Sequence, residues 1–335
     1  MRTVRWQQVK GLALGGGATI LWASFYPAGR YLFGEEAEAV DVLWLTFLRL
    51  ELGAAGFLLY VLFRQGWRQL WLALRVDWRL FVGLAVVGVA AESYLIFLSL
   101  NFTTAARSSL LSNTSPIMTA ILAFLVLKEA FGRRKVVGMV LGFVGVGGAM
   151  FSRGGDIYGG GAGFWIGDLL ALAAGACWSV YTVWGEAAAR RHGSALATAV
   201  LLTGGGLTLL PFMVASGSQM TLAMPARVWL GTIYLGVVTG GVANAMWLAA
   251  LRVIPAGRLG ALGYVSSSLT LVLSVCFLQE MVTPWFALAL LLVVAGVYLM
   301  MSGKDGRAAP ESRPAALPGA EHQHGVAADN RRAAE

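Results

Sequence analysis

The feature that most constrains this chain is a succession of long apolar runs, separated by short segments that carry charge, glycine or proline. A helix needs about 20 mostly apolar residues to cross the hydrocarbon core of a bilayer, which is about 30 Å thick. Ten runs approach this length, at approximately 11–30, 42–63, 79–100, 105–127, 135–152, 164–185, 195–215, 228–251, 257–278 and 284–302. The sequence therefore predicts an all-α integral membrane protein with ten transmembrane helices.

The composition excludes two other classes of protein. Hydrophobic residues make up 58% of the chain and charged residues only 13%, about half the charged share of a soluble domain. A largely disordered chain would instead need low hydrophobicity and high charge density. Only the segment 303–335, rich in Ala, Pro, Gly and charge, has such a composition, and it is expected to be a disordered cytoplasmic tail.

The distribution of positive charge predicts the orientation of the spans. Loops that stay in the cytoplasm are enriched in Lys and Arg. If the N-terminus is cytoplasmic, most of the 25 Lys and Arg residues fall on the cytoplasmic side. The opposite side receives only Arg30, Arg107, Arg153 and Arg227. We therefore expect both termini in the cytoplasm. The amino-acid composition further suggests a bacterial protein, which would lie in the plasma (inner) membrane.

The two halves of the sequence resemble each other. The segment from Thr103 to Glu129 aligns without gaps with the segment from Ile254 to Glu280, and the residues around Trp22 resemble those around Trp178. Each half holds five predicted spans. Because five is odd, the second copy enters the bilayer in the opposite orientation, and such inverted repeats are typical of transporters with a substrate site near the midplane.

These features are similar to the EamA-type members of the drug/metabolite transporter superfamily. The landmarks are Trp22 and Ser24 in the first span, Arg49 in the second, and the stretch 103–116 that opens the fourth. The matching helix ends at 127–129 and 278–280 complete the pattern. Two positions depart from it, because Ser267 stands opposite Pro116 and the seventh span has no counterpart of Arg49.

The resemblance implies two five-helix units, at 11–152 and 164–302, and a secondary carrier that works by alternating access. Carriers of this family commonly export amino acids, related metabolites or drugs. Efflux of cationic or lipophilic drugs is the alternative to metabolite export. An integral-membrane enzyme and a receptor or scaffold that transports nothing are the rival classes.

Glu92 is the outstanding candidate for a functional residue, because it lies in the middle of the third span. An ionisable side chain within the bilayer costs about 2.5–3.5 kcal/mol on insertion scales, so it needs a partner or a watery cavity. Glu92 could titrate a proton or balance a cationic group of the substrate, whereas a structural ion pair with Arg49 is the other interpretation. Arg49 could bind a substrate carboxylate, and Glu51, two residues further on, points elsewhere.

Aromatic and amide residues supply the remaining candidates. Trp22, Trp178 and Tyr94 could line a central cavity through ring contacts, although interfacial or lipid-facing aromatics are common in membrane proteins. Asn244 aligns with Ser93, next to Glu92, which suggests a polar pair near the midplane. Tyr26, Tyr181 and Trp247 are weaker candidates for the same cavity.

The sequence contains no recognised catalytic or metal-binding pattern. The sequence holds no phosphate-binding G-x-x-x-x-G-K-[ST], no H-E-x-x-H and no G-x-S-x-G. We therefore expect no enzyme activity, no cofactor, no metal site and no nucleic-acid partner. The expected partners are a small-molecule substrate and the lipid bilayer. Gly-x-x-x-Gly spacings such as Gly138 to Gly142 predict close helix packing and are also compatible with a homodimer.

Overall fold

The computed structural model describes residues 2–32, 41–127, 132–151, 162–254, 259, 262–279 and 283–302. Within these ranges the structure is all-helical, and its segments group into ten rods in the predicted order. The predicted tail and the helix ends at Glu129 and Glu280 lie outside the described residues.

The first half contains five rods. They are α1 (Arg2–Ala23) with α2 (Phe25–Leu32); α3 (Val42–Arg64); α4 (Trp67–Gly83) with η1 (Leu84–Ala91) and α5 (Glu92–Leu100); α6 (Ala105–Ser112) with α7 (Ser115–Leu127); and α8 (Arg133–Phe151).

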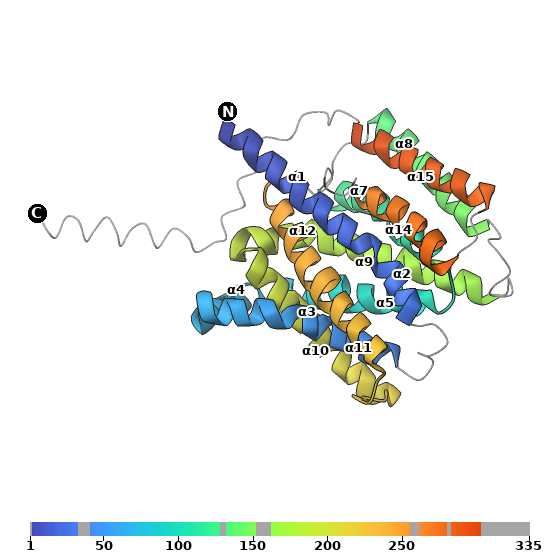
Figure 1. Ribbon diagram of the computed structural model, residues 1–335. Coiled ribbons are helices and arrows are strands. Elements are labelled where there is room, and N and C mark those ends of the chain that lie inside the picture. The colour runs from blue at the N-terminus through green and yellow to red at the C-terminus, as the bar shows by residue number, and fades with distance from the viewer. Residues whose placement is uncertain are drawn as a thin grey trace, which may run out of the picture.

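The second half repeats this arrangement. Its rods are α9 (Ala162–His192); α10 (Ser194–Ser216); α11 (Ala226–Ile233) with η3 (Tyr234–Val242) and α12 (Ala243–Leu251); α14 (Gly263–Leu278); and α15 (Pro284–Ser302). Figure 1 shows that the rods of the two halves interleave rather than form separate bundles.

Local sequence signals explain several helix boundaries. The Asp41 carboxylate accepts hydrogen bonds from the backbone N–H groups of Leu43 and Trp44 at 2.7 and 3.1 Å, and so caps α3. Thr104 caps α6 by accepting from the N–H of Arg107. Gly193 separates α9 from α10 with a φ of 83°, a conformation that favours glycine.

Two rods of the first half are broken near the prolines. The first breaks at Ser24 and the fourth at Asn113 and Thr114, and in each case a proline, Pro27 or Pro116, lies in the first turn of the following segment. Proline is tolerated in a first turn because its missing N–H would be unpaired there anyway. Ser267, the counterpart of Pro116, lies inside the unbroken α14.

Some predicted spans were shorter than the helices of the structure. The third rod begins at Trp67 rather than near 79, and α9 continues to His192 rather than ending near 185. Among the described residues, five helices are long and apolar enough to cross a membrane by themselves: Val42–Arg64, Trp67–Leu100, Trp165–His192, Ser194–Ser216 and Ala226–Leu251. Three shorter apolar helices lie within α8, α14 and α15.

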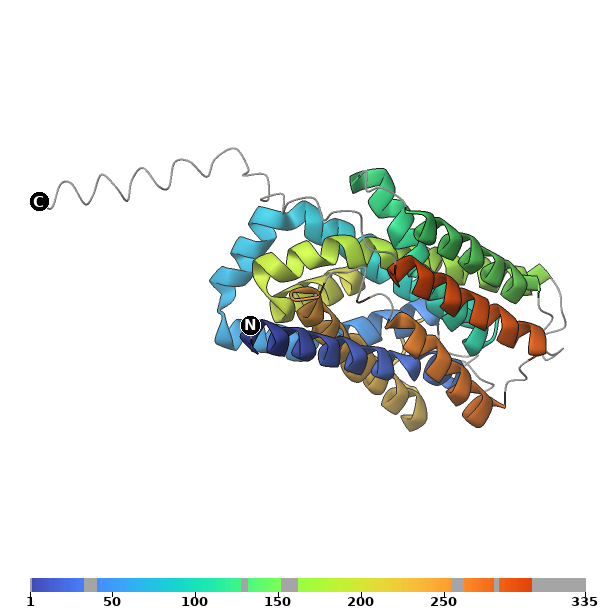
Figure 2. The ribbon, with the colours of Figure 1, turned by 90° about the horizontal axis from the view of Figure 1, so that it is seen from above.

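The packing of the rods follows the internal repeat. Helix α1 of the first half packs along α12 of the second, and in the matching contact α9 packs along α5 and η1. Likewise, α3 packs against η3 while α10 packs against η1. Equivalent helices also pair with each other, α3 with α10 and α8 with α15, the latter pair lying side by side in both views (Figures 1 and 2). This reciprocal pattern shows that the fold is a duplicated five-helix repeat.

Glycines allow the closest of these contacts. A Cβ on Gly53 of α3 would lie 2.6 Å from the carbonyl oxygen of Gly236 in η3, so the two backbones nearly touch. A Cβ on Gly296 of α15 would lie 2.5 Å from the carbonyl oxygen of Gly138 in α8. The Gly138–Gly142 spacing that was compatible with a homodimer is thus used for packing within one chain.

Candidate functional site

Two π-helical segments, η1 and η3, occupy equivalent positions in the two repeats. Segments of this kind are rare and occur frequently at functional sites, because the wider turn shifts side chains and backbone carbonyls out of the regular pattern. Glu92 is the first residue after η1, and Asn244 is the second residue after η3. The helices that carry the predicted polar residues are therefore irregular at equivalent positions of the two repeats.

Arg49 of α3 is buried between aromatic rings and a serine. Its Nη2 donates a hydrogen bond to the Ser93 hydroxyl at 2.6 Å. Its guanidinium lies 5.1 Å from the ring centre of Phe25 and 5.2 Å from that of Phe97, within the range of cation–π attraction. The side chain is only 6% exposed, and its Nε is buried without a hydrogen-bond partner among the described residues.

Glu92 joins Arg49 through Ser93. The Ser93 hydroxyl donates to Oε2 of Glu92 at 3.1 Å, so a chain of hydrogen bonds runs from the guanidinium through the hydroxyl to the carboxylate. Within the described ranges no direct ion pair connects Arg49 and Glu92. Glu92 is only partly buried. The three residues, called here the Arg49–Ser93–Glu92 relay, were predicted separately, and the structure brings them together.

Three tryptophans from three helices form an aromatic cluster. The ring of Trp22 lies 5.0 Å from that of Trp178 and 5.2 Å from that of Trp247, measured between centres. The indole N–H of Trp22 donates at 2.8 Å to the carbonyl oxygen of Thr239 within η3. Trp247 is 2% exposed, whereas Trp22 and Trp178 remain partly exposed. Trp22, Trp178 and Trp247, the tryptophan cluster, thus connect both repeats.

The relay and the tryptophan cluster lie near each other. Trp178 and Tyr181 lie on α9, the helix that packs along η1 and along α5, which begins with Glu92. Tyr181 stacks on Trp178 with ring centres 5.0 Å apart. A backbone contact supports this proximity, because a Cβ on Gly88 of η1 would lie 2.9 Å from the Cβ of Tyr181.

Other candidates contact neither the relay nor the cluster by hydrogen bonds. Asn244 donates at 2.6 Å to the carbonyl oxygen of Gly240, on its own helix. The Tyr26 hydroxyl bonds to that of Ser112 at 2.7 Å, and Tyr94 packs against the largest apolar core. Glu51 lies against α10, and its Oε1 is buried with no hydrogen-bond partner in the described part of the chain.

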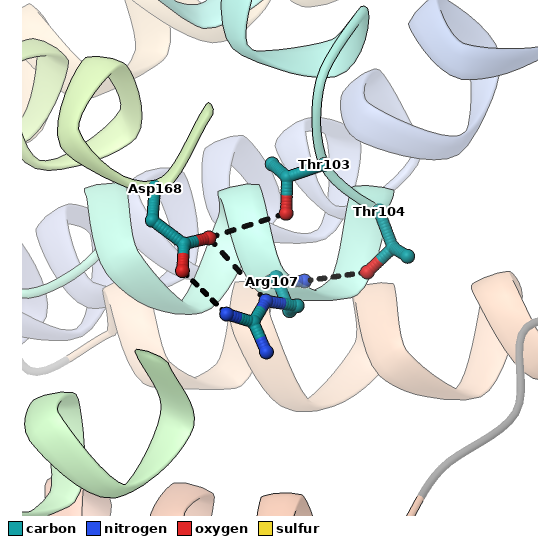
Figure 3. Close-up of polar contacts among 4 residues, drawn as sticks. All are labelled: Thr103, Thr104, Arg107 and Asp168. Atoms are coloured by element: carbon teal, nitrogen blue, oxygen red, sulfur yellow. Dashed lines mark hydrogen bonds and ion pairs between the residues drawn. The ribbon is translucent and has the colours of Figure 1, made fainter. Parts of the chain in front are cut away.

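The sequence interpretation missed a buried ion pair between the repeats. Arg107 of α6 and Asp168 of α9 make a two-pronged contact, with Nε and Nη2 of the arginine donating to the two carboxylate oxygens (Figure 3). Thr103 donates to the same carboxylate at 3.2 Å, and both charged side chains are at most 3% exposed. The sequence did contain a signal for this pair, since Asp168 and Arg107 are charged residues that each lie within a predicted apolar run.

Comparison with known proteins agrees with this architecture. The EamA-like transporter family matches the chain twice, over residues 9–151 and 165–302. The chain belongs to the EamA-like transporter family. This EamA-like protein is accordingly a multi-pass membrane transporter of the drug/metabolite transporter superfamily, and not an enzyme.

Relatives cover most of this EamA-like transporter. An uncharacterized transporter of Archaeoglobus fulgidus is 27% identical over 277 residues, which is 81% of this chain and 92% of the relative. The uncharacterized transporter YyaM of Bacillus subtilis is 22% identical, over 72% of this chain and 77% of the relative. A protein of known crystal structure shares the fold with a TM-score of 0.64 and 21% identity, over 87% of this chain and 96% of that one.

Proposed function

We propose that this transporter exports small amphipathic metabolites that carry both charges, such as amino acids, by alternating access. The observation that supports this most is the Arg49–Ser93–Glu92 relay, which places a cation and an anion together within the membrane-spanning region. A zwitterionic substrate matches such a pair, because each of its charges meets the opposite one.

The proposed roles of the residues follow from their unused hydrogen-bonding groups and their exposed surfaces. The unpartnered Nε of Arg49 can donate to a substrate carboxylate while Nη2 remains bonded to Ser93. Glu92, partly exposed, can accept from an ammonium group. The partly exposed rings of Trp22 and Trp178 can contact the apolar part of the substrate, with Tyr94, Ser93 and Asn244 as further polar contacts.

The distribution of positive charge supports an orientation of the transporter in the membrane. With both termini in the cytoplasm of a bacterium, the Lys- and Arg-rich loops face inward, and substrate leaves the cell when the two repeats rock around the relay. The units 11–152 and 164–302 are the moving halves in this proposal.

The test is flux in liposomes that contain the purified protein and a panel of radiolabelled amino acids. We expect wild-type protein to move at least one zwitterionic amino acid, and Arg49→Lys to reduce that flux at least tenfold, because a lysine lacks the guanidinium fork. Glu186→Gln is the control, since Glu186 is partly exposed, pairs with the exposed Arg190 of the same helix, and belongs to neither the relay nor the tryptophan cluster, so this variant should transport normally. Absence of flux across the whole panel would contradict the proposal.

Efflux of cationic drugs is the second candidate. It is favoured by the position of Glu92 on α5, which packs along the helix that carries the stacked rings of Trp178 and Tyr181, since a carboxylate and aromatic rings both attract lipophilic cations. Glu92→Gln separates the two proposals. Loss of resistance to lipophilic cations with normal amino-acid flux would support drug efflux, and loss of amino-acid flux would support metabolite export.

A further inference from the structure

The third rod is longer than a membrane span requires. It runs from Trp67 to Leu100, which is 34 residues, whereas about 20 are enough to cross the hydrocarbon core. The excess lies at its start, and Asp77 interrupts the helical geometry there with φ −116° and ψ 29°. Figure 2 shows the light-blue start of α4 turning a corner at the end of the molecule near the N-terminus. The part of α4 before Asp77 therefore runs across the direction of the spans.

Helix α4 carries two adjacent stripes of exposed residues, which begin in this part and continue past Asp77 to Arg79. Trp67, Trp71, Leu74 and Trp78 recur every three or four residues and form the tryptophan stripe, with exposed fractions of 39–66%. Arg68, Arg75 and Arg79 directly follow Trp67, Leu74 and Trp78 and form the arginine stripe, and all three are exposed. The third face of α4, including Leu70, Ala73 and Phe81, is buried against the protein.

The stripes contact each other rather than other parts of the protein. The Arg75 guanidinium lies 4.9 Å from the ring centre of Trp71, and that of Arg79 lies 5.4 Å from the ring centre of Trp78. Among the described residues no acidic side chain pairs with the arginine stripe. Asp77, an acid on the same helix, is already bound by Arg191 and His192, each at 2.7 Å. The positive charge of the stripe is thus available to an anion.

Comparison of the repeats shows that the fold does not require this helix. In the second repeat the matching segment, 218–225, has no helix, and α11 begins only at Ala226. That segment also holds no arginine or tryptophan. The helix of the first repeat therefore begins about two turns earlier than its counterpart in the second repeat.

We propose that the start of α4 lies in the membrane surface and binds anionic phospholipid headgroups. Tryptophan rings favour the boundary between lipid and water, and the guanidinium fork matches a phosphate. Amphipathic helices with this division of residues lie in the interface plane, and basic residues beside a span attract anionic lipids. The arginine stripe holds the headgroups, and the tryptophan stripe enters the lipid below them.

The test uses the full-length protein in detergent and measures its thermal unfolding midpoint with added phosphatidylglycerol, phosphatidylcholine or inorganic phosphate. We expect phosphatidylglycerol to raise the midpoint by about 2–4 °C at roughly ten times its Kd, and more than phosphatidylcholine does. The difference should shrink as salt is added, because exposed charges are screened.

Three variants make the test specific. Changing Arg68, Arg75 and Arg79 together to Gln should remove most of the phosphatidylglycerol effect, whereas changing the same three to Lys should keep most of it. The matched control changes three other exposed arginines, Arg133, Arg134 and Arg190, to Gln. This control should keep most of the stabilisation by phosphatidylglycerol. The proposal is overturned if the stripe and control variants respond alike, if phosphatidylcholine acts as strongly, or if inorganic phosphate reproduces the effect.

Discussion

At the scale of single residues, the most informative contact is the hydroxyl of Ser93. It accepts from Arg49 and donates to Glu92, so two opposite charges are held together without a direct ion pair. The sequence indicated all three positions, because a charge within an apolar run is costly and the repeat aligned Ser93 with Asn244. It could not indicate the order of the contacts, which depends on how α3 packs against α5.

Replacing Ser93 tests this contact. Ser93→Ala removes the bridging hydroxyl and leaves buried donors of Arg49 unpaired, a loss of about 1–3 kcal/mol. We expect amino-acid flux into liposomes to fall about fivefold to a hundredfold. Ser93→Thr keeps a hydroxyl and is the control. Equal flux from the alanine and threonine variants would show that the hydroxyl has no role.

The Arg107–Asp168 ion pair makes a prediction about stability. Removing one partner of a buried pair leaves an uncompensated charge, at a cost of about 3–5 kcal/mol. Asp168→Asn should therefore lower the thermal unfolding midpoint in detergent strongly. The double variant Arg107→Met with Asp168→Leu leaves no unpaired charge and should recover much of the loss. An unchanged midpoint for Asp168→Asn would mean that the pair contributes little.

At the scale of helices, the sequence predicted the number and order of the rods but not their π-helical segments. Apolar runs locate a span because the bilayer sets its length. Nothing in such a run distinguishes the π-helical η1 and η3 from regular helix, since their wider turns depend on contacts such as that of Trp22 with Thr239. Nor did the apolar runs extend α4 back to Trp67, because this amphipathic part is too polar to count as a span.

Two glycines of α3 test the close packing against η3. A Cβ on Gly53 would meet the Gly236 carbonyl at 2.6 Å, whereas a Cβ on Gly56 would meet nothing within 4 Å. Gly53→Ala should therefore cost about 1–3 kcal/mol through overpacking, and Gly56→Ala should not. Thermal unfolding of the two variants in the same detergent measures the difference. Equal midpoints would contradict the close approach of α3 and η3.

At the scale of the whole molecule, duplication explains both the symmetry and the exceptions to it. The reciprocal pairing of the rods repeats the fold, so the irregular segments η1 and η3 occupy equivalent positions in the two repeats. The charged residues of the relay do not follow the repeat. Arg49 and Glu92 lie in the first half alone, and so does the amphipathic start of α4. The first half therefore contributes both charged residues of the relay, and the second half contributes two members of the tryptophan cluster.

The most direct test of the account is the orientation of equivalent positions in the two repeats. Gln65 follows α3 and Ser216 ends α10, and both are exposed. In a variant with Cys177 and Cys276 replaced by serine, each position is changed to cysteine and labelled in intact cells with a membrane-impermeant maleimide. The account predicts that Ser216→Cys is labelled from outside and that Gln65→Cys is labelled only after the cells are opened. Labelling of both from the same side would contradict the inverted repeat and the transport mechanism built on it.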